Sequence, residues 1–117
     1  MTITLPAPIQ TYIDAGNTFD LETLAGAFAV DAFVNDARHE YWGIEAIHDW
    51  LARELVGDKV TMDVTEATEH YGTFTVAAVM DGLYDKTGLP DPLLLTHYFT
   101  VRDDRIVRLI NILNESR

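Results

Sequence analysis

The sequence predicts an α+β fold in which three helices come first and an antiparallel sheet follows. In most of residues 8–55 the apolar side chains recur every three or four positions, as they do on one face of a helix. After residue 58 they alternate with polar side chains at a period of two, which is typical of strands with one solvated face. A length of 117 residues suits one domain, residues 1–117, and leaves too little chain for a second.

The beginning of the chain predicts two short helices that are joined tightly. Pro8 suits a first helical turn, because the N–H that proline lacks would have no partner there, and a first helix is predicted over Pro8–Ala15. Gly16 and Asn17 supply its stop, and Asp20 is the predicted N-cap of the second helix. The apolar face of that second helix is Leu21, Leu24, Ala25 and Phe28.

A brief strand and a third helix are predicted next. The strand covers Ala32–Asp36, and residues 37–42 form a loop in a place where it can line the mouth of a cavity. The third helix opens near Gly43, and Gly57 and Asp58 end it. Its apolar positions, at helical spacing, are Ile44, Ile47, Trp50, Leu51 and Leu55.

Four strands are predicted in the second half of the chain. Residues 60–65 alternate strictly between apolar and polar side chains. The three strands that follow are Phe74–Met80, Leu93–Val101 and Ile106–Leu113. The loop 85–92 and the short turn 102–105 separate these three, and the short turn predicts that the last two strands form a hairpin.

The strand over Leu93–Val101 is apolar on both faces. Leu95 and Phe99 lie on one face, and Leu94 and Tyr98 lie on the other. Three short helices cover only one side of a sheet, so the second apolar face is predicted to meet a second copy of the chain in a homodimer. The alternative is that the curvature of the chain itself buries this strand.

Charge and composition exclude several classes of partner. Eight Lys and Arg against 19 Asp and Glu give a net charge of −11, which disfavours nucleic acid and anionic membrane surfaces. The absence of cysteine excludes disulfides, thiolate nucleophiles and cysteine-bound zinc. No apolar run approaches the roughly 20 residues of a membrane span, and the N-terminus lacks a signal core. We therefore expect a cytoplasmic protein.

The sequence also predicts no metal and no cofactor. His48, His70 and His97 lack the close spacing of metal ligands, and there is neither a glycine-rich phosphate loop nor a Gly-x-Ser-x-Gly elbow. Because His97 alternates with the apolar Leu95 and Phe99, it is predicted to lie on the dimer face.

Several segments together resemble a known family. They are residues 12–24 (YIDAGNTFDLETL), 28–36 (FAVDAFVND), 43–50 (GIEAIHDW), and a closing hairpin with Tyr98–Phe99 and Arg105–Leu109. Through them the chain resembles the SnoaL-like branch of the nuclear-transport-factor-two-like superfamily, which includes ketosteroid isomerases and polyketide cyclases. The resemblance implies a cone-shaped α+β barrel, with a curved sheet around the helices, an apolar cavity open at one end, and a dimer through the outer face of the sheet. Such folds host isomerases, cyclases, dehydratases, epoxide hydrolases and non-catalytic binders, so the resemblance specifies architecture more closely than function.

Asp36 is the first candidate for chemistry. Alternation along the short strand does not settle whether Asn35 or Asp36 points inward. The resemblance implies Asp36, which matches the aspartate with which ketosteroid isomerases remove a proton next to a carbonyl. An apolar cavity disfavours the charged form of a carboxylate and makes it a stronger base. The alternative is that Asp36 braces the following loop through backbone N–H groups.

Tyr12 and Thr96 match the positions at which those isomerases stabilise an oxyanion. Tyr12 lies on the apolar face of the first helix, and its phenol would donate a hydrogen bond to a developing enolate. The alternative is a packed ring with a satisfied hydroxyl. Thr96 replaces a second acid that the isomerases hold protonated. A threonine hydroxyl lacks the acidity to match an enolate, which puts steroid isomerisation in doubt.

The loop and the last strands supply the remaining candidates. An imidazole at His39 would form a carboxylate–histidine pair with Asp36, the alternative being a surface histidine. Asn111 interrupts an apolar run and would be a neutral anchor for a ligand if it faces the same side as Thr96; the alternative is a bridge between strands or across a dimer. The candidates for ligand contact are Trp42, Trp50, Thr96, Tyr98 and Asn111.

Two functions follow from these residues. The first is a cofactor-independent enzyme of the isomerase or cyclase type that acts on a small apolar molecule, with Asp36 as general acid/base helped by Tyr12 and His39. The alternative is a non-catalytic ligand-binding or homodimeric assembly module of the same fold. A roomy cavity with convergent polar groups favours the enzyme, whereas a cavity filled by Trp42 and Trp50 favours the module.

Overall fold

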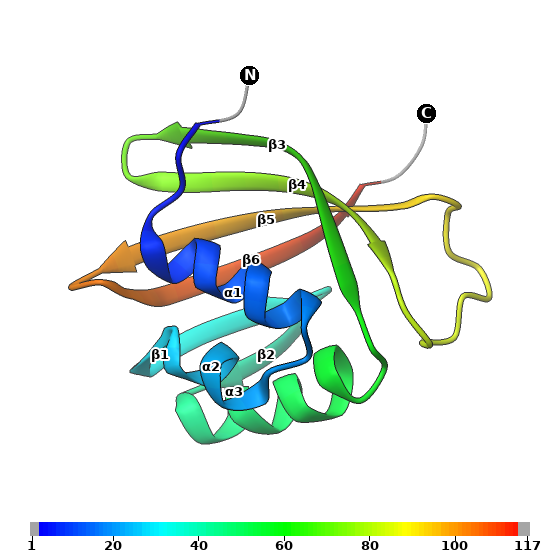
Figure 1. Cartoon of the computed structure of the whole chain (residues 1–117), viewed down its shortest axis with the longest axis horizontal. Coiled ribbons are helices and arrows are strands. Elements are labelled where there is room, and N and C mark those ends of the chain that lie inside the picture. The colour runs from blue at the N-terminus through cyan, green and yellow to red at the C-terminus, as the bar shows by residue number, and fades with distance from the viewer. Residues whose placement is uncertain (1–2, 115–117) are drawn as a thin grey trace.

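The computed structural model describes residues 3–114 (Figure 1). The helical elements are α1 (Ala7–Asn17), α2 (Leu21–Gly26), α3 (Ile44–Trp50) and a π-helical segment, η1 (Leu51–Val56), that continues α3. The strands are β1 (Phe28–Asp36), β2 (His39–Trp42), β3 (Thr61–His70), β4 (Thr73–Asp81), β5 (Leu93–Arg102) and β6 (Arg105–Asn114). The predicted α+β class is confirmed.

The strands form a curved, unclosed sheet in the order β2-β1-β6-β5-β4-β3. Neighbouring strands run antiparallel except β1 and β6, which run parallel, so the sheet is mixed where the sequence predicted an antiparallel one. Periodicity cannot show this difference, because it reveals the two faces of a strand and not the direction of its neighbour. Strand β3 carries a bulge between Val64 and Glu66, which bends it, and the helices lie on one face of the sheet (Figure 1).

The early elements differ from the predicted ones in their bounds. Helix α1 covers Ala7–Asn17 and not Pro8–Ala15, so the predicted stop at Gly16 and Asn17 lies inside the helix. The second helix was expected to include Phe28, but α2 ends at Gly26 and Phe28 is the first residue of β1. The first strand is therefore longer than the predicted Ala32–Asp36. Phe28 is buried in both interpretations, so its apolar character alone does not distinguish a helix end from a strand start. The predicted N-cap is confirmed, because the Asp20 side chain accepts a hydrogen bond from the backbone N–H of Thr23.

Strand β2 occupies the segment that was predicted to be a loop. It pairs with β1 through a two-residue turn, in which Ala37 and Arg38 adopt positive φ values of 51° and 76°. Such turns are usually signalled by Asn-Gly or Asp-Gly, which tolerate positive φ, and Ala-Arg gives no such signal. The sequence prediction therefore missed this hairpin.

The core lies between the helices and the concave face of the sheet. Its largest fully buried side chains include Trp50, Tyr12 and Phe99. The ring of Tyr12 makes edge-to-face contacts with Phe28 and Phe99, at centroid distances of 5.7 and 5.6 Å. Within residues 3–114, no helix has the length and apolar character to cross a membrane.

Candidate functional site

A cavity of about 240 Å³ opens between the helices, the sheet and the loop that follows β4. Its apolar lining is Ala37, Leu55, Val60, Met80, Leu89, Leu93, Leu95 and Leu113. Its polar lining is Tyr12, Asp36, Trp50, Glu54, Asp58, Tyr84, His97 and Asn111. Four predicted site residues, Tyr12, Asp36, Trp50 and Asn111, are thus brought together in one place.

The carboxylate of Asp36 is held by two N–H donors from distant parts of the chain. Trp50 Nε1 donates to Oδ2 at 3.2 Å, and Asn111 Nδ2 donates to Oδ1 at 3.1 Å. Asp36 is the last residue of β1 and pairs in register with Asn111 on the parallel strand β6. Asn35 instead accepts a hydrogen bond from the backbone N–H of Arg38 through its side chain, at 2.9 Å. Of the two neighbours left open by the sequence, Asp36 is the one that lines the cavity.

Tyr12 presents a protonated hydroxyl to the same cavity. The side chain is only 1% exposed, and burial, with the negative charge of Asp36 adding to it, raises the pKa of Tyr12 well above its ordinary value. The phenol therefore stays protonated at neutral pH and acts as a hydrogen-bond donor.

His97 lies on the cavity side of β5, and the prediction that places it on the dimer face is wrong. Its ring is 2% exposed, and Nδ1 lies 3.1 Å from the backbone oxygen of Val76. Because a carbonyl only accepts hydrogen bonds, Nδ1 carries the proton and donates. Burial lowers the pKa of His97, although the Val76 hydrogen bond and the charge of Asp36 act in the opposite direction. The neutral ring then carries a lone pair on Nε2.

A bulge in the last hairpin explains why His97 and Thr96 exchange faces relative to the prediction. Without it, the short turn would pair Thr96 with Asn111. The register shifts between Thr100 and Val101, so Asn111 pairs with His97 instead. Residues paired across a sheet project to the same face, and a shift of one residue reverses the face. Asp36, Asn111 and His97 consequently form a row across β1, β6 and β5.

Four other predicted site residues lie outside the cavity lining. Thr96 and Tyr98 alternate with His97 and belong to the opposite face of β5, which corrects their assignment as ligand contacts. Trp42 is 69% exposed and packs on Phe33 with a centroid distance of 4.2 Å, so its assignment as a ligand contact is corrected as well. His39 pairs in register with Asp36 on β2 but is exposed to solvent.

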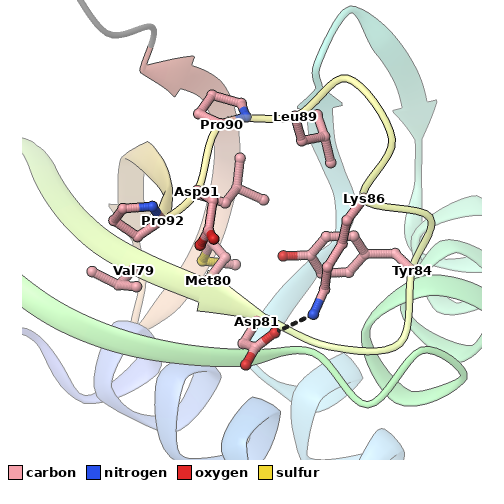
Figure 2. Close-up of a pocket in the computed structure, with 10 residues that line it drawn as sticks. Val79, Met80, Asp81, Tyr84, Lys86, Leu89, Pro90, Asp91 and Pro92 are labelled. Carbon is pink, nitrogen blue, oxygen red and sulfur yellow. Dashed lines mark hydrogen bonds and ion pairs between the residues drawn. The ribbon is translucent and has the colours of Figure 1, made fainter.

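A second hollow of about 440 Å³ lies beside the loop that joins β4 to β5 (Figure 2). Lys86 Nζ forms an ion pair with Asp81 Oδ1 at 2.7 Å on its wall. Tyr84 and Leu89 line this hollow and the first cavity alike, so the two adjoin along the loop. The sequence marked this segment only as a loop. In the described residues, no three His, Asp or Glu side chains are grouped as a metal site would require.

The burial of His97 predicts a specific dependence of stability on acid. Above the ordinary histidine pKa of 6.5, the ring is neutral in the folded and the unfolded chain. As the pH falls through that value, the unfolded chain binds the proton first, because the folded-state pKa is lower, so the free energy of unfolding decreases. We expect His97→Gln to lose less of this free energy than wild type between about pH 7 and about pH 5 in urea denaturation.

The matched control for this experiment is His70→Gln, since His70 is an exposed histidine on β3. Its acid profile is expected to follow that of the wild type. A His97→Gln profile that is superimposable on both would show that His97 does not titrate differently in the folded chain.

This geometry defines a class: small α+β cone proteins whose curved sheet and helices enclose a pocket. The SnoaL-like domain model matches residues 9–109, and the chain belongs to that family. A comparison with curated proteins finds no match.

Solved structures agree with this assignment. A candidate polyketide cyclase from Sinorhizobium meliloti is 30% identical, with a TM-score of 0.82, over 92% of this chain and 95% of that one. A candidate polyketide cyclase from Xanthomonas campestris is 25% identical, with a TM-score of 0.75, over 92% of this chain and 87% of that one. A protein from Catenulispora acidiphila with a ketosteroid isomerase-like fold, solved in complex with trimethylamine, is 23% identical, with a TM-score of 0.75, over 93% and 86% of the two chains. This last likeness shows the fold alone.

Proposed function

We propose that this chain is a cofactor-independent acid–base enzyme of the isomerase or cyclase type, which acts on a small apolar carbonyl compound. The observation that carries the proposal is that the Asp36 carboxylate and the protonated Tyr12 hydroxyl belong to the same cavity of about 240 Å³. Leucine, valine and methionine side chains supply much of the remaining wall. This is the combination that proton abstraction next to a carbonyl requires.

In the proposed reaction, Asp36 takes a proton from the carbon next to the substrate carbonyl. The electron pair of that C–H bond moves onto the carbonyl oxygen as an enolate, and the hydroxyl of Tyr12 stabilises the new negative charge by donating a hydrogen bond. Asp36 then returns the proton to carbon, at the same or another position. Trp50 and Asn111 are positioning residues, because they fix the carboxylate through one N–H each.

The test of this proposal is deuterium exchange into small apolar ketones such as indanone, followed by proton NMR in heavy water. We expect the protein to speed the loss of the proton signal next to the carbonyl over the rate in buffer alone. A ketone that binds the cavity in a calorimetric titration but exchanges no faster than in buffer would contradict the proposed reaction.

A binding or assembly module is the second candidate, and the hydrogen bonds of Asp36 favour it. The carboxylate connects α3 to β6 through Trp50 and Asn111, so it also has the contacts of a structural brace. In this case Asp36→Ala lowers the melting temperature markedly, because two buried or half-buried N–H donors lose their acceptor. An unchanged melting temperature would count against the module.

The outward face of β5 and β6 supports the further proposal of a homodimer. Ile112 is 48% exposed there and pairs in register with Thr96, while Tyr98 pairs with Ile110. We expect sedimentation to give a dimer and Ile112→Lys to shift it to the monomer, because a charge would be buried in an apolar interface. Val30→Lys is the matched control, since Val30 is 76% exposed on β1. A wild-type monomer at high concentration would exclude the dimer.

A further inference from the structure

The amide of Asn111 leaves a buried hydrogen-bond acceptor without a partner. The residue lines the cavity and is 4% exposed; Nδ2 donates to Asp36, and Oδ1 has no partner among the described residues. The orientation of the amide follows from its neighbour. An ionised carboxylate only accepts hydrogen bonds, so turning the amide around would set two acceptors against each other. A buried unpaired oxygen costs free energy that a ligand with a donor recovers.

His97 adds a second acceptor beside the first. Its Nδ1–H is used by the Val76 oxygen, which leaves the lone pair of Nε2 as the acceptor of the neutral ring. His97 and Asn111 are register partners on adjacent strands, and both line the cavity. Two acceptor atoms on neighbouring residues therefore belong to one part of the wall.

The donors of the cavity are mostly committed to Asp36. Trp50 Nε1 and Asn111 Nδ2 both donate to its carboxylate, which leaves the hydroxyls of Tyr12 and Tyr84 as side-chain donors for a ligand. The charged side chains of the lining also disfavour an acceptor or an anion on the ligand, because all of them are carboxylates. The lining contains Asp36, Glu54 and Asp58, and among its residues there is no lysine or arginine. A carboxylate on the ligand would be repelled here.

From this inventory we infer that the substrate carries, besides its carbonyl group, a hydrogen-bond donor that reaches Oδ1 of Asn111 or Nε2 of His97. The donor is a hydroxyl O–H or an amine N–H on an otherwise apolar skeleton. The inference rests on the proposed function, because it assigns the Tyr12 hydroxyl to the carbonyl oxygen. It narrows the class of substrate, because simple ketones and keto acids are then not the preferred ligands.

The experiment compares three matched ligands by calorimetric titration of the wild-type protein. They are hydroxyindanone, aminoindanone and methylindanone, with the substituent on the same ring carbon and the series repeated at each carbon of the aromatic ring. At one position or more, the hydroxyl or the amino compound is expected to bind roughly tenfold more tightly than its methyl counterpart. The ratio between hydroxyl and amino compounds identifies which donor the wall accepts.

The variant Asn111→Leu assigns the effect to its acceptor. It retains the size of the side chain and is expected to reduce the advantage of the donor-bearing ligands, with methylindanone still bound. The control is Ile112→Leu, one residue further along β6 on the opposite face, which is expected to keep the wild-type ratios. Should Asn111→Leu fail to fold, the wild-type series remains decisive.

Equal or tighter binding of methylindanone at every position would overturn the inference, since Oδ1 would then be satisfied by other means, such as a bound water. A donor preference that persists undiminished in folded Asn111→Leu and in His97→Phe would also overturn it, by moving the acceptor to Asp36. Neither result would contradict the proposed reaction, which the deuterium-exchange experiment tests separately. Conversely, donor-selective binding without exchange would overturn the proposed reaction alone.

Discussion

Asp36→Asn is expected to lower the rate of deuterium exchange into a bound ketone by about 10²- to 10⁴-fold, the range that a positioned general base contributes. The amide has nearly the shape of the carboxylate, and its oxygen still accepts the hydrogen bond from Trp50 Nε1. It cannot take up the substrate proton. We therefore expect ketone affinity to change far less than the exchange rate, so that the loss is one of turnover and not of binding.

Asp31→Asn is the matched control for this prediction. Asp31 lies on the same strand, is exposed, and does not line the cavity, so the substitution removes the same charge outside the site. Its exchange rate is expected to equal that of the wild type. If Asp36→Asn kept full exchange and a wild-type melting temperature, Asp36 would be neither the base nor a brace.

Phe99→Ala is expected to lower the free energy of unfolding by about 3–5 kcal/mol, measured by urea denaturation with tryptophan fluorescence. Phe99 is fully buried on β5, and its ring contacts Tyr12 at 5.6 Å and stacks on His97 at 6.1 Å between centroids. Its removal leaves a cavity and takes support from two polar side chains of the site. Exchange activity should therefore fall together with stability.

Phe33→Ala is the matched control, because it removes a side chain of the same size from a less buried position. Phe33 lies on β1, is only half-buried, and packs on the exposed Trp42, so less area is removed from contact. We expect a loss of stability clearly below that of Phe99→Ala. Equal losses in the two variants would mean that the contacts of Phe99 with Tyr12 and His97 contribute little beyond those of an ordinary aromatic ring.

Local sequence patterns were sufficient for the helices and for one side of the cavity. Tyr12 lies on the helical stripe that faces the core, and Trp50 has the spacing that buries it under the sheet. Both positions follow from a period fixed by helix geometry. The four late strands were also predicted, one from strict alternation over residues 60–65 and the others from their apolar segments, and the short turn 102–105 predicted their closing hairpin.

The remainder of the site depends on pairing, which local patterns do not encode. The bulge near Val107 and the apolar character of both faces of β5 leave no local sign that His97, and not Thr96, points inward. The parallel contact of β1 with β6, which sets Asn111 beside Asp36, joins segments that have no neighbour relation in sequence. Those contacts become visible only when the sheet is assembled.

The contact between Asp36 and Asn111 spans 75 positions of the chain. On a ribosome, β1 emerges early and must wait for nearly all later strands before β6 can lie beside it, and closing so long a loop is slow. Until β6 has been made, the Asp36 carboxylate therefore lacks the hydrogen bond from the Asn111 amide. The arrangement that the proposed reaction needs is therefore expected to assemble late in folding, after β6 has been synthesised and has paired with β1.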